Sequence, residues 1–413
     1  MKKDSQKSIE KNRQNVACDY IRENYAERLR YDVISQKVQI FKPHPETGVE
    51  QWFYVTNADI NSIVCDANFE TGVAITNREV LTVLNAGEKY ISQVNPLKEY
   101  VLSLAPYSGT TDWIAWLASQ VTVAPGSEEL WYNCFKRWFI GMVAGWLYDD
   151  VVNQSVIVLV GSQAKFKTTF LDRLLPSHLR NYGCKMSISN QLNRDERLRL
   201  SEFGLINLDE LDTALTPKEL NIIKSIITCT DINERSAYAY CRERRVRIAS
   251  FCGSTNRREF LTDLTGNRRF LPFEVLEIAN PYDNLIPYNM VYAQARHLLE
   301  TGFNYWFDYD DVVAMHDHTD SFRAQENEEQ ILPLLFAVPA EGKGVFMTTA
   351  QISERLVSFG NVKKPMSTSR LGMVLSAAGF QAVRKQVGGV RLRGWAVYQR
   401  NSEEINAMRN LEM

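Results

Sequence analysis

The chain has 413 residues, a net charge of −2 and the apolar and charged fractions of an ordinary globular protein, which predicts several domains with large cores. The near-neutral balance excludes a globally basic DNA-coating protein, although a local basic patch is still allowed. Seven scattered cysteines form no Cys-x-x-Cys pair, so we expect neither a disulfide framework nor a zinc ribbon. The sequence has no apolar run long enough to span a bilayer, and we expect a cytoplasmic protein without a membrane partner.

The first third of the chain predicts secondary structure but no chemistry. A helix over residues 4–30 and the strands after it are expected to form a small α/β domain, 1–92. Residues 93–150 are expected to form a helical connector. Its last helix, 128–147, is almost continuously apolar and should pack on the domain that follows.

The most informative stretch is an apolar, β-branched run, 155–160, that leads into a loop ending in Lys-Thr-Thr. This pattern predicts a buried parallel strand, a phosphate loop and a helix start. The loop consists of Gly161, Ser162, Gln163, Ala164, Lys165, Phe166, Lys167, Thr168 and Thr169. Backbone N–H groups of such a loop bind phosphates, while Lys167 would neutralise β/γ charge and Thr168 would bind Mg²⁺. The alternative is an ordinary strand–turn–helix.

Two residues depart from the usual loop pattern. Glycine is expected at the position of Phe166, just before the lysine, and Ala164 replaces a second small glycine. A side chain is costly wherever the backbone needs a positive φ. Catalytic competence therefore stays open on the residues alone.

A second motif follows some forty residues later, where a short apolar strand, 204–208, ends in Asp209 and Glu210. In a phosphate-loop ATPase, Asp209 would hold Mg²⁺ and Glu210 would polarise the attacking water. A solvated strand end is the alternative. The order of the two motifs favours the functional interpretation.

The next segment is basic and aromatic. Its candidate DNA-binding residues are Arg235, Tyr238, Tyr240, Arg242, Arg244 and Arg245. On a hairpin, guanidinium groups can meet phosphates and rings can stack on bases, although a solvated charged hairpin is equally consistent. A strand over 246–252 should lead to Asn256, where an amide can sense a γ-phosphate. Arg268 and Arg269 precede another apolar strand, from which one arginine would reach the γ-phosphate of a neighbouring subunit.

The last quarter is expected to contain a helical linker, 301–336, and a winged-helix-like domain, 337–413. Two helices precede a strand-like ribbon, in the order of a winged helix. The basic residues of this ribbon are Arg384, Lys385, Arg391 and Arg393. DNA binding and protein docking both remain open for them.

Taken together, the motifs carry a resemblance to a known family. The ordered segments are 161–169, 205–210, 250–256 and 265–270. This set resembles the virulence-associated protein E family, helicase-like ATPases of the AAA+ class found on phages and bacterial mobile elements. Thr-Gly-Asn-Arg-Arg, at 265–269, is its most specific part, and the likeness covers most of residues 90–310.

The resemblance implies a fold and a set of roles. The fold is α/β, a P-loop AAA+ ATPase core over 151–300 with an N-terminal α/β and helical region. The implied roles are Walker A for Lys167 and Thr168, Walker B for Asp209 and Glu210, sensor 1 for Asn256, and arginine finger for Arg268 or Arg269. ATP and Mg²⁺ are the implied cofactors.

These roles imply an ATP-dependent DNA helicase or translocase that works as a ring in replication of a phage or mobile element. Its expected partners are single-stranded or forked DNA, further copies of the chain in a hexameric homo-oligomer, and a primase or other replication protein. The alternative is a nucleotide-binding scaffold or DNA-binding regulator in which Phe166 has removed hydrolysis. A P-loop small-molecule kinase is disfavoured, since no segment resembles an acceptor pocket or lid.

Overall fold

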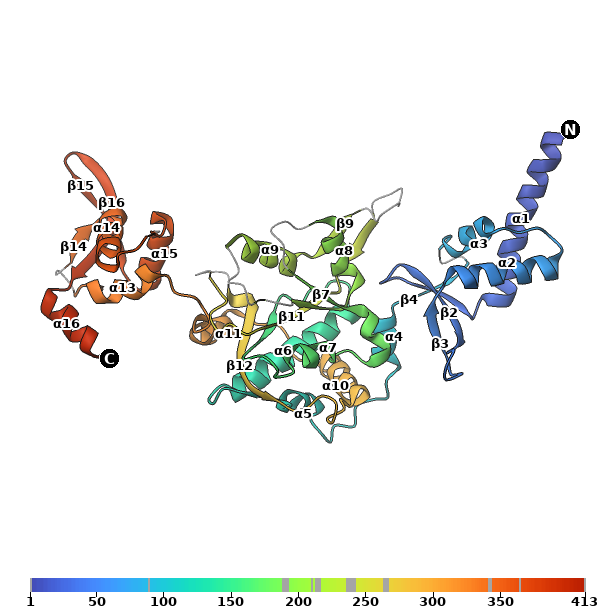
Figure 1. Ribbon diagram of the computed structural model, residues 1–413, viewed down its shortest axis with the longest axis horizontal. Helices are drawn as coiled ribbons and strands as arrows, with labels where there is room; N and C mark the ends of the chain where they lie inside the picture. The colour runs from blue at the N-terminus through green and yellow to red at the C-terminus, as the bar shows by residue number, and fades with distance from the viewer. Residues whose placement is uncertain are drawn as a thin grey trace. The chain divides into compact units, whose positions relative to one another are not determined.

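The computed structural model describes residues 2–87, 90–187, 193–208, 211, 217–234, 243–262, 267–340, 344–363 and 365–411 (Figure 1). The chain is a mixed α/β protein with several sheets. It divides into two compact units: unit 1 is Met1–Asp212, Asn221–Arg257 and Arg269–Val313, and unit 2 is Thr213–Leu220, Arg258–Arg268 and Ala314–Met413. The finer division into five segments stays a prediction. No described helix is both long and apolar enough to cross a membrane.

The N-terminal part of unit 1 is a small sheet covered by helices. Its elements are α1 (Lys2–Tyr25), β1 (Leu29–Asp32), β2 (Lys37–Pro43), β3 (Glu50–Tyr54), α2 (Asn57–Thr71), α3 (Asn77–Leu84) and β4 (Ser92–Val94). The strand order is β3-β2-β1-β4. The helix predicted over 4–30 ends earlier, at Tyr25, because Leu29 is buried in this sheet opposite Ile40.

The middle of the chain contains a six-stranded sheet, whose strands belong to unit 1. From residue 96 to residue 314 the elements are α4 (Pro96–Ser103), α5 (Trp113–Ser119), β5 (Val121–Val123), α6 (Glu128–Leu147), β6 (Val156–Val160), α7 (Lys167–Asp172), the 3₁₀ helix η1 (Ser177–Tyr182), β7 (Gly183–Met186), α8 (Arg194–Glu202), β8 (Leu205–Leu208), α9 (Pro217–Thr228), β9 (Asp231–Glu234), β10 (Glu243–Val246), β11 (Ser250–Thr255), the 3₁₀ helix η2 (Asn267–Arg269), β12 (Phe270–Ile278), α10 (Tyr288–Glu300) and α11 (Tyr309–Ala314). The strand order is β5-β12-β6-β11-β8-β7. β5 runs antiparallel to β12, and the other neighbours are parallel.

The core of this sheet lies under α6. Every residue of β6 is buried, and the apolar helix predicted over 128–147 is α6, which packs against α10 and β6 (Figure 1). Two indole N–H groups fasten it to the sheet: Trp138 donates to the carbonyl of Phe251 at 2.9 Å, and Trp146 donates to that of Gly204 at 3.1 Å. Buried indoles need such partners, so these bonds fix how α6 lies on the strands.

The strand predicted over 246–252 is two strands. β10 ends at Val246 and β11 begins at Ser250. Between them, Arg247 is 1% exposed and its guanidinium donates to backbone carbonyls, including that of Asn153 at 3.1 Å. The long-range bonds of this side chain explain why the extended pattern is interrupted here.

Unit 2 contains a compact helical and β domain. Its elements after residue 315 are α12 (His316–Asp320), α13 (Asn327–Leu335), β13 (Phe336–Ala337), β14 (Val345–Met347), α14 (Thr349–Gly360), α15 (Thr368–Ala377), β15 (Gln381–Val387), β16 (Val390–Gln399) and α16 (Ser402–Leu411). β16 pairs antiparallel with β13, β14 and β15. β15 and β16 form a ribbon, whose turn uses Gly388 and Gly389 at φ 56° and 83°, a conformation that costs glycine little. Ile352, Leu356 and Leu371 are fully buried between the helices and the sheet.

Candidate functional site

The candidate site lies at the carboxyl ends of parallel strands. β6 leads into the loop 161–166, and its parallel neighbour β11 ends at Thr255, so both ends meet at one edge of the sheet. A pocket of about 480 Å³ at this edge is lined by Gln163 to Thr169 and by Ser254 to Asn256. Ligands of open parallel sheets bind beyond the carboxyl ends of the strands, which makes this pocket the candidate site.

The side chain of Lys167 joins the two halves of the pocket. Its ammonium donates to the carbonyl oxygens of Gly161 and Ser162, each at 2.7 Å, and to Oδ1 of Asn256 at 3.0 Å. Although Lys167 is only 7% exposed, it lines the pocket. The structure thus brings together two predicted site residues, Lys167 and Asn256, that are 89 positions apart in the sequence.

Close approach to β12 explains the glycine at the start of the loop. A Cβ on Gly161 would lie 2.8 Å from the carbonyl oxygen of Val275, too close for any side chain. The same carbonyl accepts a hydrogen bond from Lys165 at 3.1 Å, and the N–H of Gly161 donates to the carbonyl of Thr255 at 3.0 Å. The loop is therefore held against β12 on one side and β11 on the other.

Ala164 and Phe166 adopt the left-handed conformation, at φ 63° and 57°. These are the two positions at which the usual pattern has glycine, so the condition under which a side chain is costly is met at both. A non-glycine residue in this region costs on the order of 1–3 kcal/mol and persists only where its surroundings hold it. The carbonyl of Phe166 accepts the N–H of Phe170 at 2.8 Å, which starts α7.

The ring of Phe166 is exposed and has an aromatic neighbour. Its centroid lies 6.4 Å from that of Tyr282 in an edge-on arrangement, and the guanidinium of Arg173 lies 4.9 Å from the Tyr282 ring. The sequence analysis missed Tyr282 and Arg173, because neither belongs to a local pattern. Phe166, which lines the pocket, and Tyr282 thus form an edge-on aromatic pair.

Thr168, on α7, and Ser254, in β11, form a second contact at the pocket. Their hydroxyl oxygens lie 3.1 Å apart, and Ser254 is 6% exposed. Ser254 was not predicted as a site residue. The signal was present, since Ser254 lies two residues before Asn256 and alternate strand residues share a face.

The predicted carboxylates, Asp209 and Glu210, lie outside the described residues. β8, which precedes them, pairs in parallel with β11, so its carboxyl end lies at the same edge as the pocket. Asn207, within β8, is 2% exposed and donates to Oδ1 of Asp172 on α7 at 2.9 Å. This bond fixes α7 to the strand that leads to the carboxylates. Within the described residues, no cluster of three or more His, Cys, Asp or Glu could hold a metal ion.

The predicted arginine pair lies in η2, directly before β12. Arg268 is exposed and Arg269 is half-buried. β12 is parallel to β6 and begins with Phe270 opposite Val156, the first residue of β6. Arg269 therefore lies at the amino edge of the sheet, whereas the pocket of the same chain lies at the carboxyl edge. Five strand residues separate the two edges, about 16 Å at 3.3 Å per residue.

The predicted DNA-binding residues are only partly described. Arg235, Tyr238, Tyr240 and Arg242 lie outside the described residues. β9 and β10 do form an antiparallel hairpin, in which Arg244 is exposed. Arg245, by contrast, is 8% exposed, forms an ion pair with Glu202 at 3.1 Å and donates to Gln36. Alternation along the strand turns Arg245 inward, and this differs from the exposed cation that the sequence predicted.

Comparison with known proteins identifies one family. A family model described as a virulence-associated protein E-like domain matches residues 108–328, more than half of the chain. Among curated proteins, none matches. Solved structures of the C-terminal region of NrS-1 resemble this chain: an A-form apo structure has a TM-score of 0.45, and another apo structure has 0.46. Each is 12% identical and covers 90% of this chain and 96% of its own, so the similarity in sequence and in structure is low.

Proposed function

The chain belongs to the virulence-associated protein E-like family, and on that premise we propose that it is an ATP-dependent DNA helicase or translocase. The motor works as a ring in the replication of a phage or mobile element. Its core, 151–300, is a P-loop ATPase of the AAA+ class. One observation carries this proposal: a lysine enclosed by its own loop contacts an asparagine at the end of the adjacent parallel strand, beside a pocket.

The predicted site residues each have a proposed role in phosphoryl chemistry. Lys167 neutralises phosphate charge, and the loop's backbone N–H groups bind phosphate oxygens. Thr168 and Asp209 would hold Mg²⁺, which supplies charge neutralisation at the phosphates. Glu210 orients the attacking water, and Asn256 senses whether the γ-phosphate is present by exchanging its contact with Lys167.

The distance between the amino edge of the sheet, where Arg269 lies, and the carboxyl edge, where the pocket lies, supports a ring of subunits. Because Arg269 lies at the amino edge of the sheet, it does not complete the pocket of its own chain, and Arg268, the residue before it, is exposed. A hexameric homo-oligomer supplies a neighbouring subunit for these arginines. Single-stranded or forked DNA contacts Arg244 on β10 and the predicted residues Arg235, Tyr238, Tyr240 and Arg242, while Arg245 stays with Glu202. A primase or other replication protein is a further partner.

For residues 337–413 we propose a winged-helix-like domain. The order of elements supports it: β14, two helices α14 and α15, and then the ribbon β15–β16, with β14 and β15 both paired to β16.

The second candidate function is a nucleotide-binding scaffold or DNA-binding regulator. The specific observation in its favour is the left-handed backbone of Ala164 and Phe166, where side chains replace glycine in the phosphate loop. If this loop binds phosphates without supporting the transition state, assembly survives and hydrolysis does not. ATP turnover separates the two functions.

The test measures ATP binding and turnover with and without single-stranded DNA. Lys167→Ala should abolish binding or turnover, because it removes the phosphate charge, whereas Glu210→Gln should keep binding and block hydrolysis. Lys98→Ala is the control: this lysine is exposed on α4 and does not line the pocket, so its loss should change turnover little. An equal loss of binding in Lys167→Ala and Glu210→Gln would contradict the roles. A wild-type protein without turnover under any DNA condition would favour the scaffold.

A further inference from the structure

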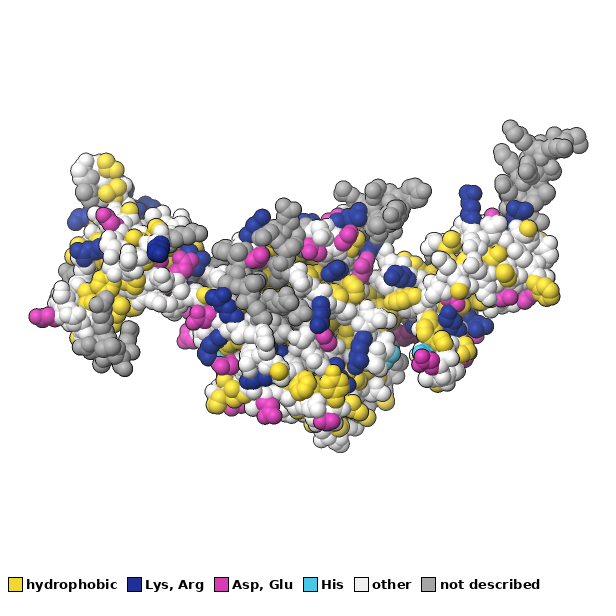
Figure 2. All heavy atoms as spheres, in the orientation of Figure 1, with side chains coloured by type: hydrophobic (Ala, Val, Ile, Leu, Met, Phe, Trp, Pro, Cys, Tyr) yellow, Lys and Arg dark blue, Asp and Glu magenta, His cyan; other side chains and the backbone are white. Residues whose placement is uncertain are grey.

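The C-terminal part of the chain carries a strong charge asymmetry. Residues 355–402 contain no Asp or Glu, although the whole chain has a net charge of −2. The basic residues in this stretch are Arg355, Lys363, Lys364, Arg370, Arg384, Lys385, Arg391, Arg393 and Arg400. Lys and Arg side chains are spread over the visible face of this domain (Figure 2). Such a local excess of positive charge attracts a polyanion.

Two of these arginines serve the domain's own structure. Arg370 pairs with Glu326 at 2.8 Å and donates to the carbonyl of Thr262, and Arg400 donates to the carbonyl of Pro333 at 3.1 Å. The β15–β16 ribbon is different. Its four basic residues are exposed, and no ion pair joins any of them to a carboxylate of the described residues.

The register of the ribbon gathers three guanidinium groups on one face. Arg384 lies directly opposite Arg393, and Arg391 lies opposite Gln386. Opposite residues and alternate residues of a strand share a face, so Arg384, Arg391 and Arg393 point the same way. Like charges directly opposite each other are destabilising in a ribbon. An anionic partner removes that repulsion, and nothing in the ribbon itself does so.

We propose that this face of the β15–β16 ribbon binds the phosphate backbone of double-stranded DNA. Arg391 and Arg393 are two residues apart, about 6.8 Å along the strand. This spacing allows the two arginines to contact two phosphates of one DNA strand. Arg384 lies opposite Arg393 on the neighbouring strand, about 5 Å away between Cβ atoms, and widens the surface that contacts the DNA.

The helix beside the ribbon favours a duplex over a single strand. α15 ends at Ala377, and β15 begins at Gln381, so the two elements are adjacent in the chain. The outward positions of α15 include Ser369, Met373 and Ser376, which are exposed and uncharged, while its inner face is buried. A helix without acidic residues on its outer face can enter a major groove about 12 Å wide while an adjoining ribbon contacts the backbone. By contrast, single-strand binding relies on stacking platforms, and the ribbon residues 381–393 include no aromatic side chain.

The experiment measures affinity of the full chain for a short DNA duplex by fluorescence anisotropy at several salt concentrations, without nucleotide. The triple variant Arg384→Ala, Arg391→Ala, Arg393→Ala should reduce the slope of log K against log salt by about 2.7, since each phosphate contact on B-DNA contributes about 0.9. Affinity for a single strand should change much less. Replacing the same three residues by Lys keeps the charge and should keep most of the slope.

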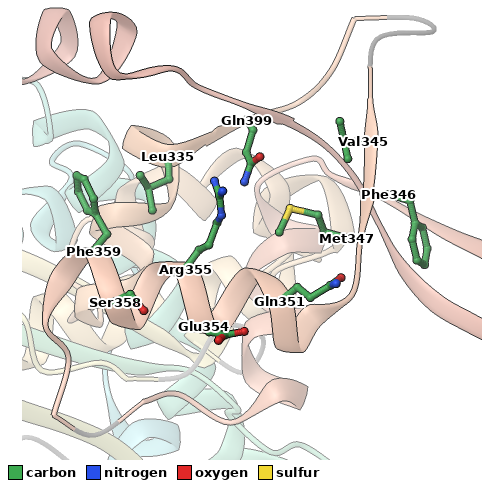
Figure 3. A pocket seen from close by; sticks show the side chains of 10 residues that line it. All are labelled: Leu335, Val345, Phe346, Met347, Gln351, Glu354, Arg355, Ser358, Phe359 and Gln399. Carbon is green, nitrogen blue, oxygen red and sulfur yellow. The ribbon is translucent and has the colours of Figure 1, made fainter.

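The matched control is Arg355→Ala. Arg355 is exposed like the ribbon arginines, but it lines a hollow of about 820 Å³ beside β14, with Leu335, Met347 and Gln399 (Figure 3). β14 and β15 pair with overlapping residues of β16, from opposite sides, so Arg355 lies toward the other edge of this sheet. Its loss should leave the slope unchanged within about 0.3, although it removes the same charge.

Three outcomes would overturn the proposal: an unchanged slope for the triple variant, an equal loss for Arg355→Ala, or a loss confined to the single strand. An unchanged slope would make the ribbon a surface for a protein. Because the side chains are exposed, the variant should unfold at the wild-type temperature. Were it to unfold earlier, Arg391→Ala alone, with an expected change of about 0.9, gives the same test. The same measurement in Lys167→Ala protein separates this proposal from that of the ATPase, because duplex binding by the ribbon needs no nucleotide.

Discussion

Two arginine-bearing segments of this chain look alike in sequence and differ in structure. In the segment 244–247, Arg245 and Arg247 are buried and bound to fixed partners, whereas in the ribbon 384–393 every basic side chain is exposed. The partners of the first pair come from distant parts of the chain, such as Glu202 and the carbonyl of Asn153. The difference teaches that alternation of charge predicts a hairpin, but only tertiary contacts decide whether its cations stabilise the fold or meet a ligand.

Arg247 is the extreme of the buried class. Its guanidinium donates to the carbonyls of Ala249 at 3.2 Å, Cys229 at 3.0 Å and Asn153 at 3.1 Å, and also to that of Ile227. Burial lowers the pKa of Arg247 to about 10, so the side chain is still charged at neutral pH. It joins the end of α9 to the segments that enter β6 and β11. This arginine therefore organises the sheet that carries the candidate site, without touching the pocket.

The largest effect is expected from Arg268, which belongs neither to the buried arginines of 244–247 nor to the exposed ones of the ribbon. Arg268→Ala should reduce ATP turnover by on the order of 10³–10⁵ while nucleotide binding and thermal unfolding stay unchanged, since an arginine finger stabilises charge that develops during phosphoryl transfer. Arg268 is preferred to Arg269 because it is exposed, whereas Arg269 is half-buried. Arg269→Ala is the comparison variant.

A mixing experiment tests whether the arginine acts in trans. Inactive Lys167→Ala subunits, whose arginines are intact, are combined with inactive Arg268→Ala subunits, whose loop is intact, and turnover is measured. Restored activity is the expected result, because mixed rings contain sites with both parts. Co-assembled mixtures that stay inactive, or a wild-type specific rate that does not depend on protein concentration, would defeat the ring.

The second largest effect is a loss of folding stability, which should distinguish the buried Arg247 from the exposed Arg393. Arg247→Ala should lower the free energy of unfolding by about 3–5 kcal/mol, because it removes a buried charge and leaves several carbonyls without a donor. Arg393→Ala, in the ribbon, should change it by no more than about 0.5 kcal/mol. Urea unfolding followed by tryptophan fluorescence measures both, since Trp138 and Trp146 are buried in unit 1 and Trp395, on β16, is buried in unit 2. A loss below about 1 kcal/mol for Arg247→Ala would show that the two arginine classes do not differ in this way.

Much of the secondary structure around the site was predictable, because the sequence patterns that determine it span only a few neighbouring residues. The apolar run of β6, the helix α6 and the loop that begins at Gly161 follow from periodicity and from one glycine whose Cβ would meet Val275. The predicted end of the first helix, residue 30, was wrong by five residues, since α1 ends at Tyr25. The reason is that pairing of Leu29 with Ile40 in the sheet outweighs the helical pattern of the sequence. Helix propensity is a weak prior where burial in a sheet competes with it.

The site was predictable where one motif contains the residues and not where two segments meet. Lys167 and Asn256 were each found from a strand end, and the parallel pairing of β6 and β11 brings them together. Tyr282 could not be found, since its only relation to Phe166 is through space. The strand predicted over 246–252 failed for a similar reason, because the bonds of Arg247 reach residues as far away as Asn153. The roles of Asp209, Glu210, Arg235, Tyr238, Tyr240 and Arg242 stay predictions.

The smallest effect separates two adjacent arginines of one strand. Arg244→Ala should reduce the salt slope of single-stranded DNA binding by about 0.7, the contribution of one phosphate contact, because this side chain is exposed on the β9–β10 hairpin. Arg245→Ala should leave the slope unchanged and instead lower the free energy of unfolding by about 1–3 kcal/mol, since it leaves the carboxylate of Glu202 without its partner. Anisotropy titrations at several salt concentrations and urea unfolding on both variants provide the measurements. A slope reduced equally in both variants would mean that Arg245 leaves Glu202 to reach DNA. Arg244 and Arg245 would then not differ as buried and DNA-facing arginines, and two unchanged slopes would mean that neither arginine contacts a phosphate.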